Sequence, residues 1–271
     1  MRRLIFTLLY DRGSFMLSRN FRLQKVGTID WLFENYDFAT VSRGLDELMV
    51  LDVSKGEKNP KDFAEKVSHI AGKCFIPMTV GGGITSTEIA KIYMRSGADK
   101  LLLNSCFAIN PRLCCSLAEL YGRQCIVAGI DYQKTHAELR VVKVQNGTRE
   151  ISQSLSKWVE FVQENGAGEI LFQSIERDGT GMGLDLSVID SLDRLPEIPC
   201  ILMGGVGKAG HIVEGLSYPY VDAVATANLF NFIGSSFLQV REFILKSDVK
   251  VAQWADSDFA SLRGKFAGQK S

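Results

Sequence analysis

The sequence predicts a single (β/α)8 barrel built from two half-barrel repeats. Short β-type runs alternate with amphipathic helical stretches along the whole chain, and this alternation is typical of a parallel sheet covered by helices. Segments of the first half also recur, in the same order, in the second half. Two four-strand units of this kind would close one barrel together, so we expect one domain rather than two.

Eight apolar runs mark the predicted barrel strands. The intervals between them carry apolar residues at helical spacing, for example Phe63, Ala64, Val67 and Ile70. Apolar positions three or four residues apart form one face of a helix, so each strand is followed by a predicted helix. The strands are expected near residues 3–9, 47–53, 76–80, 100–104, 125–131, 169–175, 199–203 and 222–226.

The internal repeat rests on three matches. Residues 47–53 (ELMVLDV) resemble residues 169–175 (EILFQSI), and residues 76–83 resemble residues 198–205 at the same shift of 122 positions (169 minus 47). With one further residue inserted, Ala98-Asp99 corresponds to Val221-Asp222. We therefore expect a barrel over 1–248, with half-barrels of about 1–122 and 123–248.

Two segments fall outside the eightfold pattern. Residues 138–151 alternate between apolar and polar and are interrupted by Asn146-Gly147, which predicts a hairpin with a two-residue turn after the fifth strand. Residues 249–271 form a C-terminal extension. Its sequence is compatible with an appended helix, a partner contact or a loose tail.

Composition excludes several classes of function. The 31 basic and 31 acidic residues give a formal net charge of zero, which argues against binding of nucleic acid or of an anionic membrane surface. The apolar start ends at Asp11 without a cleavage site for a signal peptide, and no segment approaches the roughly 18 apolar residues of a membrane span. Three scattered histidines suggest no metal site, and no cofactor is expected. We expect a cytoplasmic protein whose cysteines are reduced, namely Cys74, Cys106, Cys114, Cys115, Cys125 and Cys200.

Glycine-rich loops follow equivalent strands in the two halves. Glycine lets the backbone approach a ligand, so that unpaired N–H groups can face an anion, and barrels of this kind commonly bind phosphate at the C-terminal ends of their strands. Tight turns alone would also use glycine, but the duplication favours two opposed sites and a ligand phosphorylated at both ends. The predicted phosphate-binding residues are Gly81, Gly82, Gly83, Asn104, Ser105, Asp178, Gly179, Gly204, Gly205, Ala227 and Asn228.

Five motifs, by their order and spacing, resemble the cyclase subunit of imidazole glycerol phosphate synthase over residues 3–245. They are Asp46-Glu47-Leu48 through Leu51-Asp52, and residues 79–84 (TVGGGI), 97–100 (GADK), 166–170 (GAGEI) and 175–180 (IERDGT). The resemblance implies a barrel that receives ammonia from a glutaminase subunit docked at its N-terminal face. It further implies that ammonia crosses the barrel and attacks a substrate with two phosphates, and that an imidazole ring closes, in histidine biosynthesis.

The resemblance also implies a general acid and a general base, both aspartates, at the ends of strands one and five. Asp131 matches the second aspartate, but Leu9 occupies the position of the first, and the internal repeat points to the same position. Leucine cannot transfer a proton, and losing a general acid or base costs about 10²–10⁴-fold in rate. Asp11 lies two residues farther, in the predicted loop and about 7 Å along the chain. We expect that Asp11 does not replace the missing carboxylate unless a bulge repositions it.

Three further residues depart from the pattern that the resemblance implies. Leu17 stands where a lysine is expected in the flexible loop after strand one, which would close over substrate. Gln173 and Met203 stand at mouth positions where small hydroxyl residues are expected. Neutral sequence divergence could explain each of these substitutions alone. Together with Leu9 they argue against the cyclase reaction of the histidine pathway.

The expected floor of the barrel is retained. Arg3, Glu47, Lys100 and Glu169 match the charged residues that, by the resemblance, form an ammonia gate, and Asp99 matches a residue that docks the glutaminase. Charged residues at strand starts could instead form a purely structural cluster of ion pairs.

Three hypotheses follow from a retained gate and a lost aspartate. The favoured one is a divergent relative that passes ammonia to another acceptor, with sugar amidation in polysaccharide biosynthesis as the expected setting and a sugar amidotransferase as a further partner. The second is the ordinary cyclase of histidine biosynthesis, and the third a non-catalytic activator of a glutaminase. Because a fold does not fix a function, another phosphate-binding barrel enzyme stays open at this stage.

Overall fold

Eight parallel strands form a closed barrel, as the sequence predicts. The computed structural model describes residues 1–135, 139–228 and 236–252. Each barrel strand lies within the residues expected for it or extends them by a few positions. The barrel strands are β1 (Arg3–Asp11), β4 (Glu47–Asp52), β5 (Met78–Gly81), β6 (Lys100–Leu103), β7 (Ile126–Lys134), β10 (Glu169–Ser174), β11 (Cys200–Met203) and β12 (Ala223–Thr226).

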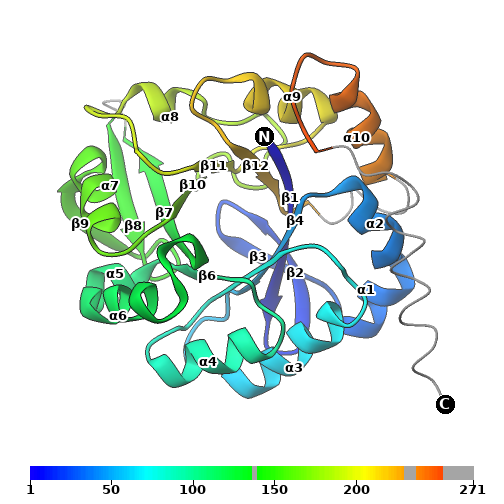
Figure 1. Ribbon diagram of the computed structural model, residues 1–271, viewed down its shortest axis with the longest axis horizontal. Helices are drawn as coiled ribbons and strands as arrows, with labels where there is room; N and C mark the ends of the chain where they lie inside the picture. The colour runs from blue at the N-terminus through cyan, green and yellow to red at the C-terminus, as the bar shows by residue number, and fades with distance from the viewer. Residues whose placement is uncertain (136–138, 229–235, 253–271) are drawn as a thin grey trace.

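The strands follow one another around the barrel in chain order. β1 pairs with β4 and with β12, and the parallel pairing of β10 with β7 joins the two halves of the sheet. Because every pair is parallel, all amino ends of the strands lie at one end of the barrel and all carboxyl ends at the other. Figure 1 shows the strands at the centre and the helices around them.

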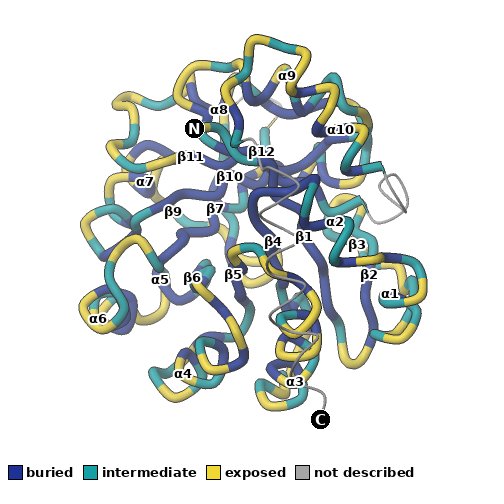
Figure 2. The backbone as a smooth tube through the Cα atoms, turned by 45° about the vertical axis from the view of Figure 1, so that its right-hand side comes forward, coloured by how far each residue is buried: buried dark blue, intermediate teal, exposed yellow. Residues whose placement is uncertain are grey.

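Helices cover the outside of the barrel. Several begin at a side chain that caps the helix: Asn59 accepts a hydrogen bond from the Asp62 N–H and is followed by Pro60, and Ser86 accepts one from the Ile89 N–H. Their outer faces are exposed and their inner faces buried (Figure 2). The helices are α1 (Ile29–Asn35), α2 (Phe38–Gly44), α3 (Pro60–Ala71), α4 (Thr87–Arg95), α5 (Ser105–Ile109), α6 (Pro111–Tyr121), the 3₁₀ turn η1 (Arg123–Cys125), α7 (Leu155–Glu164), α8 (Ser187–Asp190), α9 (Ala209–Ser217) and α10 (Ser236–Leu245).

The apolar core has two parts, one on each face of the closed sheet. The larger part lies between strands and helices and includes Phe6, Phe63 and Phe172. The smaller part fills the barrel interior, because alternate residues of each strand point inward. The interior residues are Ile5, Met49, Val127, Leu171, Ile201, Met203, Ala223 and Ala225.

Two antiparallel hairpins extend from the carboxyl ends of β1 and β7. The second, β8 (Arg140–Val144) and β9 (Arg149–Ser154), confirms the predicted hairpin, with Glu138 outside the described residues. The predicted two-residue turn at Asn146-Gly147 was wrong, because residues 145–148 connect the paired strands. The first, β2 (Ser14–Arg19) and β3 (Arg22–Gly27), replaces the loop expected after strand one. The expectation of a loop was wrong. The sequence carries no hairpin signal there, because the turn at Asn20-Phe21 contains no glycine although both residues have positive φ.

Equivalent carboxylates in the two halves make the same contact. Asp99 accepts a hydrogen bond from the Met78 N–H at 2.8 Å, and Asp222 accepts one from the Cys200 N–H at 3.0 Å. Met78 and Cys200 are 122 positions apart, as are the other matched segments. This pair of contacts supports the proposal of two half-barrel repeats.

The start of the chain and residues 249–252 lie together at the amino ends of the strands. The Arg2 N–H donates to the Lys250 carbonyl at 2.9 Å, and Val251 is buried. Of the predicted extension 249–271, the part from residue 253 onward lies outside the described residues. Within the described ranges, no helix has the length and apolar character needed to cross a membrane.

A buried ion pair ties α10 to the loop before β4. Arg241 donates to both carboxylate oxygens of Asp46, at 2.7 and 2.6 Å, and the Leu4 N–H donates to Asp46 at 2.7 Å. Both side chains are almost wholly buried. Removing one partner of such a pair leaves an uncompensated buried charge, which is far more costly than removing both.

We therefore expect Arg241→Leu to lower the free energy of unfolding by about 3–5 kcal/mol. Urea denaturation followed by circular dichroism measures this loss, and the double variant Asp46→Leu with Arg241→Leu should recover much of it. The exposed pair of Arg194 and Glu197 supplies the control: Arg194→Leu should cost less than about 1 kcal/mol. Equal losses for the two arginine variants would contradict this account.

Candidate active site

Four charged side chains form a closed ring at the amino ends of the strands. Arg3 contacts Glu47 at 2.9 Å and Glu169 at 2.7 Å, and Lys100 contacts the same two carboxylates at 3.0 and 2.9 Å. Each is the first residue of its strand, on β1, β4, β6 and β10. Burial lowers the pKa of Arg3, but attraction to Glu169 and Glu47 outweighs this effect and raises it. The four residues predicted as a gate are thus brought together, with opposite charges alternating around the ring.

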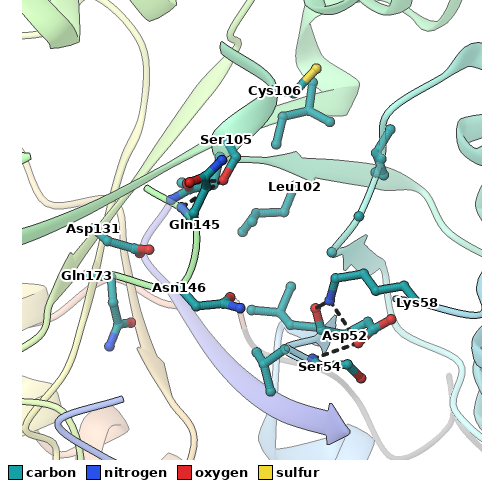
Figure 3. A pocket seen from close by; sticks show the side chains of 18 of the residues that line it. Asp52, Ser54, Lys58, Leu102, Ser105, Cys106, Asp131, Gln145, Asn146 and Gln173 are labelled. Atoms are coloured by element: carbon teal, nitrogen blue, oxygen red, sulfur yellow. Dashed lines mark hydrogen bonds and ion pairs between the residues drawn. The ribbon is translucent and has the colours of Figure 1, made fainter. Parts of the chain in front are cut away.

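The opposite end of the barrel opens into a cavity of about 420 Å³, which we call the larger mouth cavity. Its floor is apolar and includes Leu9, Leu51, Leu102 and Leu171. Polar groups surround this floor. Figure 3 shows Asp131 and Gln173 on one side, Asp52, Ser54 and Lys58 on the other, and Asn146 between them.

Asp131 is the predicted catalytic residue, and it lines the larger mouth cavity from the end of β7. Burial raises the pKa of its carboxyl to about 7, and repulsion from Asp178 adds to this rise, whereas a hydrogen bond with Asn104 lowers it. A carboxyl with a pKa near neutrality can both donate and accept a proton. Its environment therefore suits a general acid or base.

The position that would hold a second carboxylate is apolar. Leu9 is buried and lines the floor of the larger mouth cavity. Asp11 is the last residue of β1, where it pairs with Ser14, and its carboxylate contacts the Arg12 guanidinium at 3.0 Å. The expectation that Asp11 lies in a loop was wrong because β1 continues directly into the hairpin. Asp11 lines neither mouth cavity described here.

Asp178 is a buried carboxylate at the mouth, although the sequence suggested it only as a phosphate ligand. It accepts hydrogen bonds from the Ser18 hydroxyl and from the Phe21 N–H, the latter at 3.1 Å. Burial raises its pKa, while the bond from Ser18 lowers it. Asp178 thus connects the loop after β10 to the first hairpin, and its charge acts on Asp131.

The first predicted phosphate site lies at the edge of the larger mouth cavity. Gly82 and Gly83 have positive φ values of 106° and 70° and line the cavity together with Asn104 and Ser105. Ser105 accepts a hydrogen bond from the Gln145 N–H at 2.9 Å, which ties this site to the second hairpin. Gly81 is a strand residue of β5 against Leu102 and does not line the cavity.

The second predicted phosphate site is a separate space of about 170 Å³, which we call the smaller mouth cavity. Asp178 also lines the larger mouth cavity, so it stands between the two. All six residues predicted for this half line it, namely Asp178, Gly179, Gly204, Gly205, Ala227 and Asn228.

Sequence reasoning missed several polar residues of the mouth. Lys58 donates to the Asp52 carboxylate at 3.0 Å and to its carbonyl at 2.7 Å, and its side chain covers Gly83. Asp52 is the last residue of the second barrel strand, and residues at that position line the mouth of such barrels, so its place in the sequence could have identified it as a mouth residue. Lys58 comes from the following loop, which offers no sequence signal of its own.

Comparisons with known proteins agree with the geometry. Residues 34–234 match the family model described as histidine biosynthesis protein. The chain is 39% identical over 254 residues to a protein of Parasynechococcus marenigrum named "Putative imidazole glycerol phosphate synthase subunit hisF2", covering 93% of this chain and 94% of that protein. It is 36% identical over 206 residues to imidazole glycerol phosphate synthase subunit HisF of Chlorobium phaeobacteroides (76% and 82% covered), and 35% identical over 229 residues to that of Bacillus cereus (84% and 89% covered).

The raised pKa of Asp131 predicts a pH-dependent stability. Between the ordinary value of 3.8 and about 7 the folded chain binds a proton that the unfolded chain does not, so this group's contribution to stability falls as pH rises through that range. Asp131→Asn should therefore be more stable than the wild type at pH 8, by at most about 4 kcal/mol, and the advantage should vanish near pH 4.

Urea denaturation at several pH values measures this difference, and ¹³C NMR of the aspartate carboxyls locates the titration directly. Since the hydrogen bond with Asn104 lowers the pKa of Asp131, Asn104→Leu should shift that titration upward. A difference between Asp131→Asn and the wild type that is constant from pH 4 to pH 8 would contradict the assignment.

Proposed function

Because the chain belongs to the histidine biosynthesis protein family, and within it to the relatives of imidazole glycerol phosphate synthase subunit HisF, we propose that it accepts ammonia from a glutaminase partner. In this proposal the barrel conducts ammonia to the mouth and so supports nitrogen transfer to an acceptor. The observation that carries the proposal is a complete charged ring at the amino ends of the strands, combined with an incomplete acid–base pair at the mouth.

The charged ring supports an entrance at the amino ends of the strands. Glu47 and Glu169 each contact two cations. The ring is therefore closed by ion pairs alone, which can separate to let a small molecule pass. The surrounding face also offers contacts for a protein. Phe75 and Tyr220 are exposed in the segments that lead into β5 and β12, and the predicted docking residue Asp99 is exposed just before β6.

The apolar interior above the ring supports passage of a neutral molecule. Burying an unpaired ammonium ion among Ile5, Met49 and Leu171 would cost far more than burying ammonia. These side chains are buried and in contact, so transit requires some of them to change rotamer. The unbranched side chain of Met49 suits such a change.

The residues at the mouth favour an acceptor other than the aminoimidazole substrate of histidine biosynthesis. Leu9 has no proton-transfer group that could act together with Asp131. Leu17, Gln173 and Met203 also differ from the residues expected at the mouth. Sugar amidation in polysaccharide biosynthesis is the proposed setting. A separate sugar amidotransferase would then hold the acceptor, and ammonia would leave this barrel at the larger mouth cavity.

Two other functions are compatible with this site. The ordinary cyclase is supported by the two glycine-lined sites and by the near-neutral pKa of Asp131, with Asp178 as the second buried carboxylate. A non-catalytic activator of a glutaminase would need only the amino-end face and no chemistry at the mouth.

The partner is tested first. Addition of the full chain to a purified glutaminase subunit of imidazole glycerol phosphate synthase, from the organism that supplies this chain, should raise glutamine hydrolysis at least about tenfold, because docking orders the glutaminase site. Phe75→Asp should reduce this stimulation strongly, since it places a charge on the proposed interface.

Met182→Asp provides the matched control, because Met182 is also an exposed apolar residue but lies in the loop after β10, at the mouth. Stimulation should be unchanged in this variant. The proposal is abandoned if the wild-type chain leaves hydrolysis unaltered, or if the two variants lower it equally.

The acceptor is tested with ammonia and the bis-phosphorylated aminoimidazole substrate of the cyclase. We expect turnover by the wild-type chain to be absent or reduced by about 10²–10⁴-fold relative to a HisF relative, because one proton-transfer group is missing. Leu9→Asp should raise turnover at least about tenfold, and Asp131→Asn should remove what it gains. Full cyclase turnover by the wild-type chain would instead establish the ordinary cyclase.

A further inference from the structure

The first hairpin lies across the barrel mouth and is fixed at its tip. The Asn20 side-chain amide donates to the carbonyls of Ile175 and Glu176 at 3.1 and 2.8 Å, and the Phe21 N–H donates to Asp178 at 3.1 Å. Gly179 packs so closely on the Ser18 carbonyl that a Cβ atom there would lie 2.1 Å from it. The hairpin therefore forms a wall of the site rather than a distant appendage.

Two arginines flank the turn of this hairpin. Arg19 ends β2 and Arg22 begins β3, and they are direct partners in the antiparallel register. Directly opposite residues of an antiparallel pair point to the same face, and like charges in that arrangement repel. Within the described ranges, neither guanidinium has an acidic partner. Both side chains are exposed, and an anion held between them would relieve their mutual repulsion.

Both arginines line the smaller mouth cavity. Asp178 also lines this cavity, where it accepts hydrogen bonds from Ser18 and Phe21, and within the described ranges it forms no ion pair with either arginine. Gly204 and Gly205 also line this cavity, and their φ values of 101° and 99° favour glycine.

An unsatisfied hydroxyl gives independent support for a ligand in this cavity. Thr226 is buried and lines the smaller mouth cavity. Its buried Oγ1 has no hydrogen-bond partner within the described part of the chain. A buried hydroxyl without a partner is costly. A ligand oxygen in the cavity could satisfy it.

We propose that Arg19 and Arg22 clamp a phosphoryl group with two negative charges in the smaller mouth cavity, and so determine which anionic end of the ligand binds there. The planar fork of each guanidinium suits two hydrogen bonds to phosphoryl oxygens. This inference rests on the proposed function only in assigning the site to the acceptor side of the barrel. It adds side-chain charges that the glycine loops alone do not supply.

The test is a titration of the isotope-labelled full chain with inorganic phosphate, followed by NMR without any partner. The backbone amides of Gly204 and Gly205 report on the smaller mouth cavity, and those of Gly82 and Gly83 report on the larger. For Arg19→Gln with Arg22→Gln, we expect the dissociation constant measured at Gly204 and Gly205 to rise at least tenfold. The titration at Gly82 and Gly83 should change less than twofold.

Arg12→Gln with Lys25→Gln is the matched control, because it removes two positive charges from the same part of the chain at residues that do not line the smaller mouth cavity. This variant should bind phosphate like the wild type. Unchanged amide positions of Asn20 and Phe21 in both variants verify that the hairpin stays in place.

The inference is overturned if wild-type phosphate binding leaves Gly204 and Gly205 unperturbed, if the double arginine variant binds as well as the wild type, or if the control loses as much affinity. These results do not involve the glutaminase. Loss of glutaminase stimulation with intact phosphate binding would remove the proposed function alone, and the reverse result would remove only the arginine clamp.

Discussion

Closure of the parallel sheet is the constraint on which the rest of the structure depends. Because β10 pairs with β7 and β12 pairs with β1, each strand has a neighbour on both sides and all strands run in the same direction. First residues of strands therefore meet at one end, where they form the charged ring, and last residues meet at the other, where they form the mouth. Residues as far apart in the sequence as Arg3 and Ala223, 220 positions (223 minus 3), become direct neighbours in this way.

The same constraint explains how much the sequence could predict. The repeat indicated a closed barrel and the glycines after the strands predicted the mouth loops, whereas the charged ring of Arg3, Glu47, Lys100 and Glu169 was implied by the family resemblance. The first hairpin was not predictable in this way, because a phenylalanine with positive φ at Phe21 has no local signal and is held by distant groups of residues 175–178. Lys58 and the position of Asp11 were missed for the same reason: they depend on how loops pack on one another, not on periodicity.

Electrostatics at the mouth follow from the apolar floor. Leu9, Leu51 and Leu102 line the same cavity as Asp131. Burial disfavours the charged form of Asp131, and the nearby Asp178 adds repulsion. A carboxylate at position 9 would have added a second negative charge to this small space. Leu9 therefore does more than remove one functional group, since it also makes the surroundings of the remaining carboxyl less polar.

The position of residues 249–252 has a consequence for synthesis of the chain on the ribosome. β1 is made long before its partner β12 and the segment around Val251, which pairs with Arg2. One edge of β1 therefore stays open until β12 has emerged. Contacts between such distant positions form slowly, and the exposed strand edge of the nascent chain is where protection by a chaperone would matter most.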